Sequence, residues 1–187
     1  KEFRLNFSFG NIGIREELGQ YVPLDMIKVK GGILNGVLKL SENKVKKTMN
    51  VIGNLKIKNG KLSYVDFDGD IENVNAVIDL KKEKITVKAD TKLSEQPVSL
   101  ALDYLPEKNK LNLKLNANNV PFEEIARYKV IKDTKFTATG GITGNLNVNV
   151  DIKGKKATLD GKFSSDNITI SNYNFQNVKT AMKILGK

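Results

Sequence analysis

The chain has 187 residues and contains no histidine, cysteine or tryptophan, which excludes a histidine general base, a thiolate nucleophile and the commonest nitrogen and sulfur ligands of metals. The formal net charge of +10 comes almost wholly from lysines, which are dispersed among apolar residues and not clustered with arginine and exposed aromatic side chains, so we expect no nucleic-acid binding. We predict neither an enzyme nor a cofactor or metal site, while attraction to anionic lipid headgroups is compatible with the charge.

Alternation of apolar and polar residues dominates the chain from its start. It runs through residues 3–9, 55–57, 74–80, 85–89, 98–102, 111–115, 142–152, 157–163 and 168–184. Because successive side chains of a strand point to opposite faces, this period of two is typical of half-buried antiparallel strands. We therefore predict an all-β fold in which each strand has one apolar and one polar face.

Turn-forming residues separate these runs. The dipeptides are Asn59-Gly60, Asp68-Gly69, Gly140-Gly141, Lys153-Gly154 and Asp160-Gly161, and two polar turns are expected at 81–84 and 106–109. Asparagine, aspartate and glycine favour tight turns because they tolerate the backbone conformations that turns require.

Two short stretches depart from alternation. Ile14, Leu18 and Tyr21 have the spacing of one helical face, and Pro121 is suited to the start of a second short helix that contains Phe122 and Ile125. We expect both helices, 14–21 and the one after Pro121, to pack against an edge or an end of the sheet.

The chain lacks an apolar stretch of the roughly 18 residues needed to span a bilayer, and its N-terminus lacks the apolar core of a signal peptide. We therefore expect residues 1–187 to form a single β-rich segment of a longer protein, whose membrane anchor lies outside it.

The direction of the apolar faces is not decided by alternation alone. A β-sandwich or barrel would close these faces on each other, whereas a long curved sheet would leave them as the lining of an open trough. Sparse aromatic residues and repetitive Leu, Ile and Val favour the trough, because compact sandwiches usually contain large aromatic anchors. Weak similarity between segments of the chain, such as GNLKIKNGKL at 53–62 and GNLNVNV at 144–150, also favours an elongated architecture.

Five segments in order resemble the TamB/AsmA-like family of envelope proteins. They are GGILNGVLKL (31–40), GNLKIKNGKLSYVDFDGDIENVNAVIDL (53–80), KLNLKLNANNVPFEEI (110–125), GGITGNLNVNVDIKG (140–154) and LDGKFSSDNITI (159–170). The resemblance covers residues 31–184 and rests on the pattern of short strands and on the position of the glycines between them. It implies a sheet rolled into an open, hydrophobic-lined trough, the β-taco.

The resemblance also implies a function and a location. The parent protein would be anchored in the inner membrane and would cross the periplasm of a Gram-negative cell. There it would carry phospholipid between the inner and outer membranes and support outer-membrane biogenesis beside an Omp85-type barrel (TamA- or BamA-like).

We predict that one apolar face shelters phospholipid acyl chains, because unpolarised contact with methylene groups is worth about 0.8 kcal/mol for each one buried. The residues expected to line it are Leu55, Ile57, Ile78, Leu80, Ile85, Val87, Leu100, Leu102, Leu111, Leu113, Leu115, Leu146, Val148, Val150 and Ile152. The alternatives are packing of these residues in a closed core and, for function, a structural or adhesive β-repeat module that binds protein or glycan.

Other motifs carry less weight. Asp66, Asp68 and Asp70 have the spacing that opens an EF-hand loop, but Ile71 stands where that loop requires glycine, and Val77 where it requires glutamate. We expect a solvated hairpin tip there. We also expect the lysines at 56–61 and 81–84 to lie on outer strand faces, where lysine discourages edge-to-edge pairing.

Overall fold

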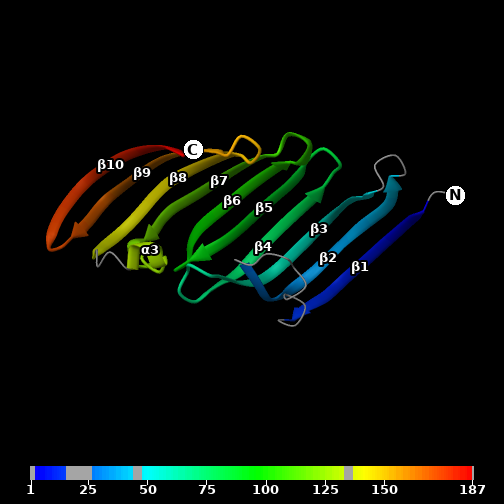
Figure 1. Ribbon diagram of the computed structural model, residues 1–187. Helices are drawn as coiled ribbons and strands as arrows, with labels where there is room; N and C mark the ends of the chain where they lie inside the picture. Colours follow the sequence, from blue (N-terminus) through cyan, green and yellow to red (C-terminus); the bar gives the residue numbers. More distant parts are fainter. Residues whose placement is uncertain (1–2, 16–26, 44–47, 133–136, 187) are drawn as a thin grey trace.

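The described strands form one open antiparallel sheet (Figure 1). The computed structural model describes residues 3–15, 27–43, 48–132 and 137–186. The strands are β1 (Arg4–Arg15), β2 (Ile27–Asn43), β3 (Thr48–Tyr64), β4 (Asp70–Leu80), β5 (Ile85–Leu93), β6 (Gln96–Leu105), β7 (Lys110–Pro121), β8 (Ala138–Asp151), β9 (Lys156–Ile170) and β10 (Tyr173–Gly186). The ten strands follow one another across the sheet in chain order. The all-β prediction and the open sheet are thereby confirmed.

The sheet twists and curves, and no second sheet covers it among the described residues (Figure 1). The accessible area is 13277 Å² for a chain of 20.8 kDa, whereas a compact monomer of this mass would expose about 8,900 Å². This excess is expected of a sheet that no second sheet covers. The alternative of a closed sandwich does not describe this fold.

Three of the predicted turns are wrong, because they lie inside long strands. Asn59-Gly60 lies in β3, Gly140-Gly141 in β8 and Asp160-Gly161 in β9. Asp68-Gly69 and Lys153-Gly154 do lie in turns, as do residues 81–84, and a 3-10 turn, η1 (Pro106–Lys108), connects β6 to β7.

Two of the three wrongly predicted turns, at residues 59–60 and 140–141, are instead β-bulges within the strands. Asn11, Asn59, Asn73 and Asn119 have φ values of 54°, 50°, 55° and 51°, and each lies where the register with the neighbouring strand shifts. A bulge places two residues opposite one and increases the local bend of a strand. Asparagine tolerates the left-handed backbone conformation at such a position better than most residues. The bulges therefore allow long strands to curve without ending.

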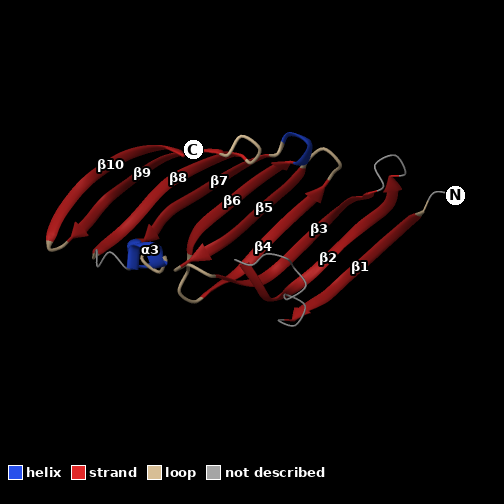
Figure 2. Cartoon of the chain, in the orientation of Figure 1, coloured by secondary structure: helices blue, strands red, loops and turns tan. Residues whose placement is uncertain are grey.

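In the described part of the chain, α-helices occur only in the connection between β7 and β8, and the other helical segment drawn in Figure 2 is the 3-10 turn η1 between β6 and β7. Helix α2 (Phe122–Ile125) begins directly after Pro121, as predicted, and α3 (Lys129–Lys132) follows it. The predicted helix over 14–21 is wrong at Ile14, which belongs to β1, and residues 16–21 lie outside the described residues.

Few apolar residues of the described chain are buried, and three of them form a cluster next to α2, while the others are Phe67, Val74, Ala76 and Val120. Phe122 packs with Ala138 of β8 and Ile168 of β9, and these three residues are each no more than 9% exposed. Half-buried side chains surround them, among them Ile142 and Val178. Burial of Phe122 thus fixes the connection between β7 and β8 to one end of the sheet.

The bulge at Asn73 gives a test of this account. Replacing Asn73 with valine should destabilise the sheet by about 1–2 kcal/mol, because a β-branched residue disfavours positive φ, whereas Asn73→Gly should change stability little. Urea unfolding followed by circular dichroism measures both. Asn145→Val is the matched control, since Asn145 is an exposed strand residue outside the bulges. Equal stability of the Asn73→Val and Asn73→Gly variants would contradict the assignment.

Candidate functional site

Three rows of apolar residues cross the whole sheet on one face, which we call the apolar face. Residues paired directly opposite each other in neighbouring antiparallel strands project to the same side. The register therefore joins side chains from β1 to β10 into continuous rows. The first row is Phe7, Leu38, Gly53, Leu80, Ile85, Tyr104, Leu111, Val150, Ala157 and Gly186; the second is Phe9, Gly36, Leu55, Ile78, Val87, Leu102, Leu113, Val148, Leu159 and Ile184; the third is Ile12, Leu34, Ile57, Ala76, Ala89, Leu100, Leu115, Leu146, Gly161 and Met182.

All but one of the residues predicted to line the trough lie in these rows. Fourteen of them, from Leu55 to Val150, are half-buried. Ile152 is the exception, because β8 ends at Asp151, and Ile152 lies in the following turn with 49% of its surface exposed. Sequence reasoning left out the continuation of the rows onto the outer strands, such as Phe7 of β1 and Ile184 of β10, because only the register shows that these residues share the face.

The rows form a strip without a charged side chain. Ten strands at about 4.8 Å spacing make it roughly 43 Å long and on the order of 800 Å² in area. The largest apolar patch on a typical soluble monomer is about 300–600 Å², and larger patches mark binding sites. The apolar face is therefore the main candidate functional surface.

The opposite face is polar and is tied together by side-chain hydrogen bonds. A row parallel to the apolar ones contains Asn54, Asp79, Thr86, Asp103, Asn112, Asn149 and Thr158. Asn54 Nδ2 donates to Asp79 Oδ1 at 2.6 Å, and Thr86 Oγ1 donates to Asp103 Oδ1 at 3.0 Å. This contrast makes one face suitable for water and the other for hydrocarbon.

Residues 122–132, which we call the lip, cover one end of the apolar face. Their partner is the turn between β3 and β4, although four strands separate the two segments in the sheet. The Asp68 amide donates to the Arg127 carbonyl at 2.9 Å, and the Lys129 amide donates to the Asp66 carbonyl at 2.8 Å. The Tyr128 ring packs edge-on against Phe67, with centroids 5.3 Å apart. The lip is thus held at both ends, by Phe122 and by this turn.

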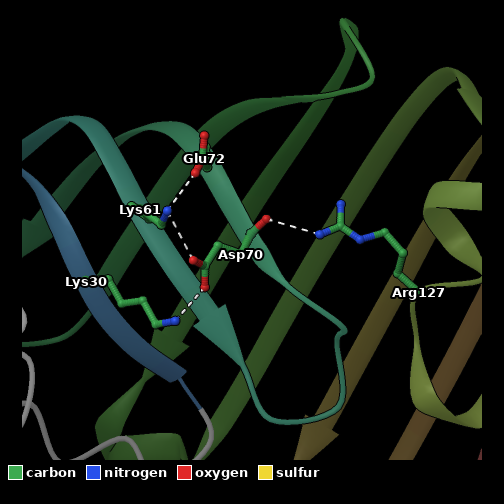
Figure 3. Close-up of polar contacts among 5 residues, drawn as sticks. All are labelled: Lys30, Lys61, Asp70, Glu72 and Arg127. Carbon is green, nitrogen blue, oxygen red and sulfur yellow. Dashed lines mark hydrogen bonds and ion pairs between the residues drawn. The ribbon is translucent and has the colours of Figure 1, made fainter.

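Arg127 is the main polar connection of the lip (Figure 3). Its guanidinium donates from Nε to the Asp68 carbonyl at 2.8 Å and from Nη2 to the Asp70 carbonyl at 3.4 Å. It also lies over the Phe67 ring, 4.4 Å from the centroid, where a cation–π contact is favourable. The side chain of Asp70 is paired with Lys30 and Lys61, at 2.7 and 3.2 Å.

Two carboxylates of this region are stabilised in their charged form. Hydrogen bonds from Ser94 and then Arg127 hold the pKa of Glu124 below its usual value, and the hydrogen bond from Lys132 does the same for the pKa of Asp68. A lowered pKa in the folded state means that these contacts support the lip at neutral pH and are lost as the pH falls through the folded values.

A cavity of about 310 Å³ lies beneath the lip. Its walls are almost wholly apolar, and they include Ala89, Leu100 and Leu115 of the third row together with Val98, Ala117, Val120, Ile125, Tyr128 and Phe163. The third row therefore leads directly from the apolar face into the cavity.

The other end of the sheet carries a lysine-rich edge, which we call the lysine rim. The turns after β4, β6 and β8 all lie at this end of the sheet (Figure 1). These turns, together with the first residues of β7 and β9, contain Lys81, Lys82, Lys84, Lys108, Lys110, Lys153, Lys155 and Lys156. The acids of the same stretches are fewer, namely Glu83, Glu107 and Asp151. Of the lysines predicted on outer strand faces, Lys56 and Lys58 are exposed strand residues, whereas Lys61 pairs with Asp70 and Glu72. The prediction is wrong for the lysines at 81–84, because these residues lie in the turn between β4 and β5.

The side chains of the three aspartates with EF-hand spacing, Asp66, Asp68 and Asp70, do not form a common metal site. Asp68 pairs with Lys132 at 2.7 Å and Asp70 with Lys30 and Lys61. Over the described residues, no group of three or more acidic side chains has the geometry of a metal site, and no helix there has the length and hydropathy of a membrane span.

Comparisons of the chain with family profiles, curated proteins and solved structures found no match.

Replacing Arg127 with methionine tests how the lip is held. The variant keeps a long side chain but loses both carbonyl contacts, so we expect the amides of Asp68 and Lys129 to exchange with solvent at least tenfold faster, while amides in β6 and β7 stay protected. Hydrogen exchange measures this directly. Lys114→Met, which removes a charge from the outer face of β7, is the control. Unchanged exchange at both lip amides would show that Arg127 does not hold the lip.

Proposed function

We propose that this chain is a lipid-handling segment of a TamB/AsmA-like protein and that its apolar face shelters phospholipid acyl chains. The observation that carries the proposal is the set of three continuous apolar rows, which cross all ten strands and, apart from the lip at one end, have no covering layer among the described elements. Hydrocarbon chains suit such a surface because they require neither hydrogen bonds nor a particular orientation about their axis.

The half-buried state of the lining residues supports this proposal. In a closed core, residues such as Leu113 and Val148 would be buried, whereas here they are shielded only by their neighbours in the sheet. Covering them with acyl chains would remove apolar surface from water at about 25 cal/mol per Å². A passive groove of this kind binds many lipids with little selectivity along its length.

The lysine rim supplies a place for the headgroups. Phosphates at the mouth of the trough would lie near lysines of three neighbouring turns, while the acyl chains extend over the first and second rows. We propose that the parent protein works in the periplasm, anchored in the inner membrane, and passes phospholipid toward the outer membrane beside an Omp85-type barrel.

Val148→Asp tests the function of the apolar face. The charge should abolish lipid binding, because a carboxylate in the middle of the second row makes contact with acyl chains unfavourable, and an open sheet should keep its fold. Native mass spectrometry of the purified chain, with organic extraction of bound lipid, gives the readout, and circular dichroism checks the fold. Leu113→Asp repeats the test on the paired residue.

Asn147→Asp is the matched control, since residue 147 is next to Val148 in β8 but projects to the opposite face. It should bind lipid as the unchanged chain does. A wild-type chain that purifies without lipid and also rejects added phospholipid would overturn the proposal, and a structural role would then be the better explanation.

Charge reversal at the lysine rim gives a second test. The triple variant Lys82→Glu, Lys108→Glu, Lys155→Glu should bind vesicles of equal parts phosphatidylglycerol and phosphatidylcholine on the order of 100-fold more weakly, because each lysine near an anionic surface contributes about 1 kcal/mol. Vesicle co-sedimentation at low and high salt measures the effect. Lys56→Glu, Lys88→Glu, Lys114→Glu changes the charge equally on the outer face and should weaken binding less. Equal losses in both triples would show that net charge, and not the rim, governs binding.

A further inference from the structure

The cavity beneath the lip differs from the rest of the apolar face because it is partly enclosed. Its volume of about 310 Å³ lies at the lower end of the range for small-molecule sites, about 300–1,000 Å³. A partly enclosed apolar site of this size contacts a ligand from more than one side, whereas the open rows can touch it from one side only. Enclosure therefore makes this the place of strongest contact with a hydrocarbon.

Thr91 and Glu124, two of the polar residues that line the cavity, have hydrogen-bond partners within the protein. Both oxygens of Glu124, a lining residue, accept hydrogen bonds, from Ser94 Oγ at 2.6 Å and from Arg127 Nη1 at 2.7 Å. Arg127 in turn donates to the backbone of the β3–β4 turn. Among the described residues, no buried side-chain nitrogen or oxygen lacks a hydrogen-bond partner. Because its walls are almost wholly apolar, the cavity suits an apolar chain end better than a headgroup.

The distance from the lysine rim to the cavity matches the length of one phospholipid. Lys110 stands at the rim, and Ala117, seven residues further along β7, lines the cavity. At about 3.4 Å for each residue, these positions are about 24 Å apart. Half of a bilayer, headgroup included, is about 20–22 Å thick. A phospholipid that lies along β7 with its phosphate at Lys110 therefore reaches the cavity with the ends of its chains.

We infer that the cavity is a binding site for the methyl end of one acyl chain, and that the lysine rim and the lip together orient the lipid along the strands. The inference rests on the proposed function and adds a direction and a chain-length limit to it. The headgroup lies at the lysine rim, the middle of the chain crosses the first, second and third rows, and the methyl end fills the space between the third row and the lip.

Chain-length dependence of binding is the first test. Lysophospholipids with saturated chains of increasing length should bind about fourfold more tightly for each added methylene, until the methyl end fills the cavity and the gain stops. Ala89→Phe fills part of the cavity from β5 and should move this limit to chains that are shorter by several methylenes. Val98→Phe on β6 does the same from another wall, should the first variant fail to fold.

Ala101→Phe is the matched control, because residue 101 is in β6 but projects to the outer face, opposite Lys88 and Lys114. It should leave the limit unchanged. Spin-labelled chains provide a second readout by NMR. A nitroxide near the methyl end should broaden the amides of Ala117 and Ile125, and a nitroxide near the headgroup should broaden Lys110.

The outcomes separate this inference from the proposed function. If lipids bind and Val148→Asp abolishes binding, but the chain-length limit is the same in wild type and Ala89→Phe, the apolar face works without an end site and the inference is wrong. Broadening that does not depend on the label position would also refute it. If no lipid binds at all, the proposed function itself fails.

Discussion

The hydrogen-bonded register of the meander is the constraint on which the other features depend. Each strand pairs with its chain neighbour, and the pairs align apolar residues with apolar residues across ten strands. A shift of one residue in any pair would turn a whole strand over and put its leucines on the polar side. Side-chain ladders on the outer face, such as Asn54 with Asp79 and Thr86 with Asp103, favour the observed register.

Much of the sheet follows from local pattern, because alternation requires only neighbouring residues. It was enough to predict the strand faces and to single out residues such as Leu113 and Val148, which the register then places opposite each other. Asparagine and glycine signals were less informative. Asn59 and Asp68 look equally suited to a turn, but Asn59 lies in a bulge within β3, and both structures use the same backbone conformations. The choice depends on whether pairing continues beyond the residue, which the local sequence does not encode.

The lip could not be predicted for a different reason. Pro121 indicated a helix, and α2 is found there, but the contacts that position it lie far away in the chain. Arg127 and Asp68 are 59 residues apart, and neither stands in a recognisable motif. Tyr128 and Phe67 are ordinary aromatic residues until the sheet brings their rings to 5.3 Å. The cavity is thus a property of the tertiary structure, while the lysine rim is visible in the turn sequences themselves.

The strictly sequential strand order also bears on how the chain folds. Every sheet contact is made between consecutive strands, so each hairpin can form as soon as its two strands are available, and contacts of low sequence separation are reached quickly. The sheet can therefore grow from one end during synthesis, without waiting for distant segments. The lip is the exception, because its bonds to residues 66–70 close a long loop whose entropy must be overcome. It should be the last part to assemble and the first to open.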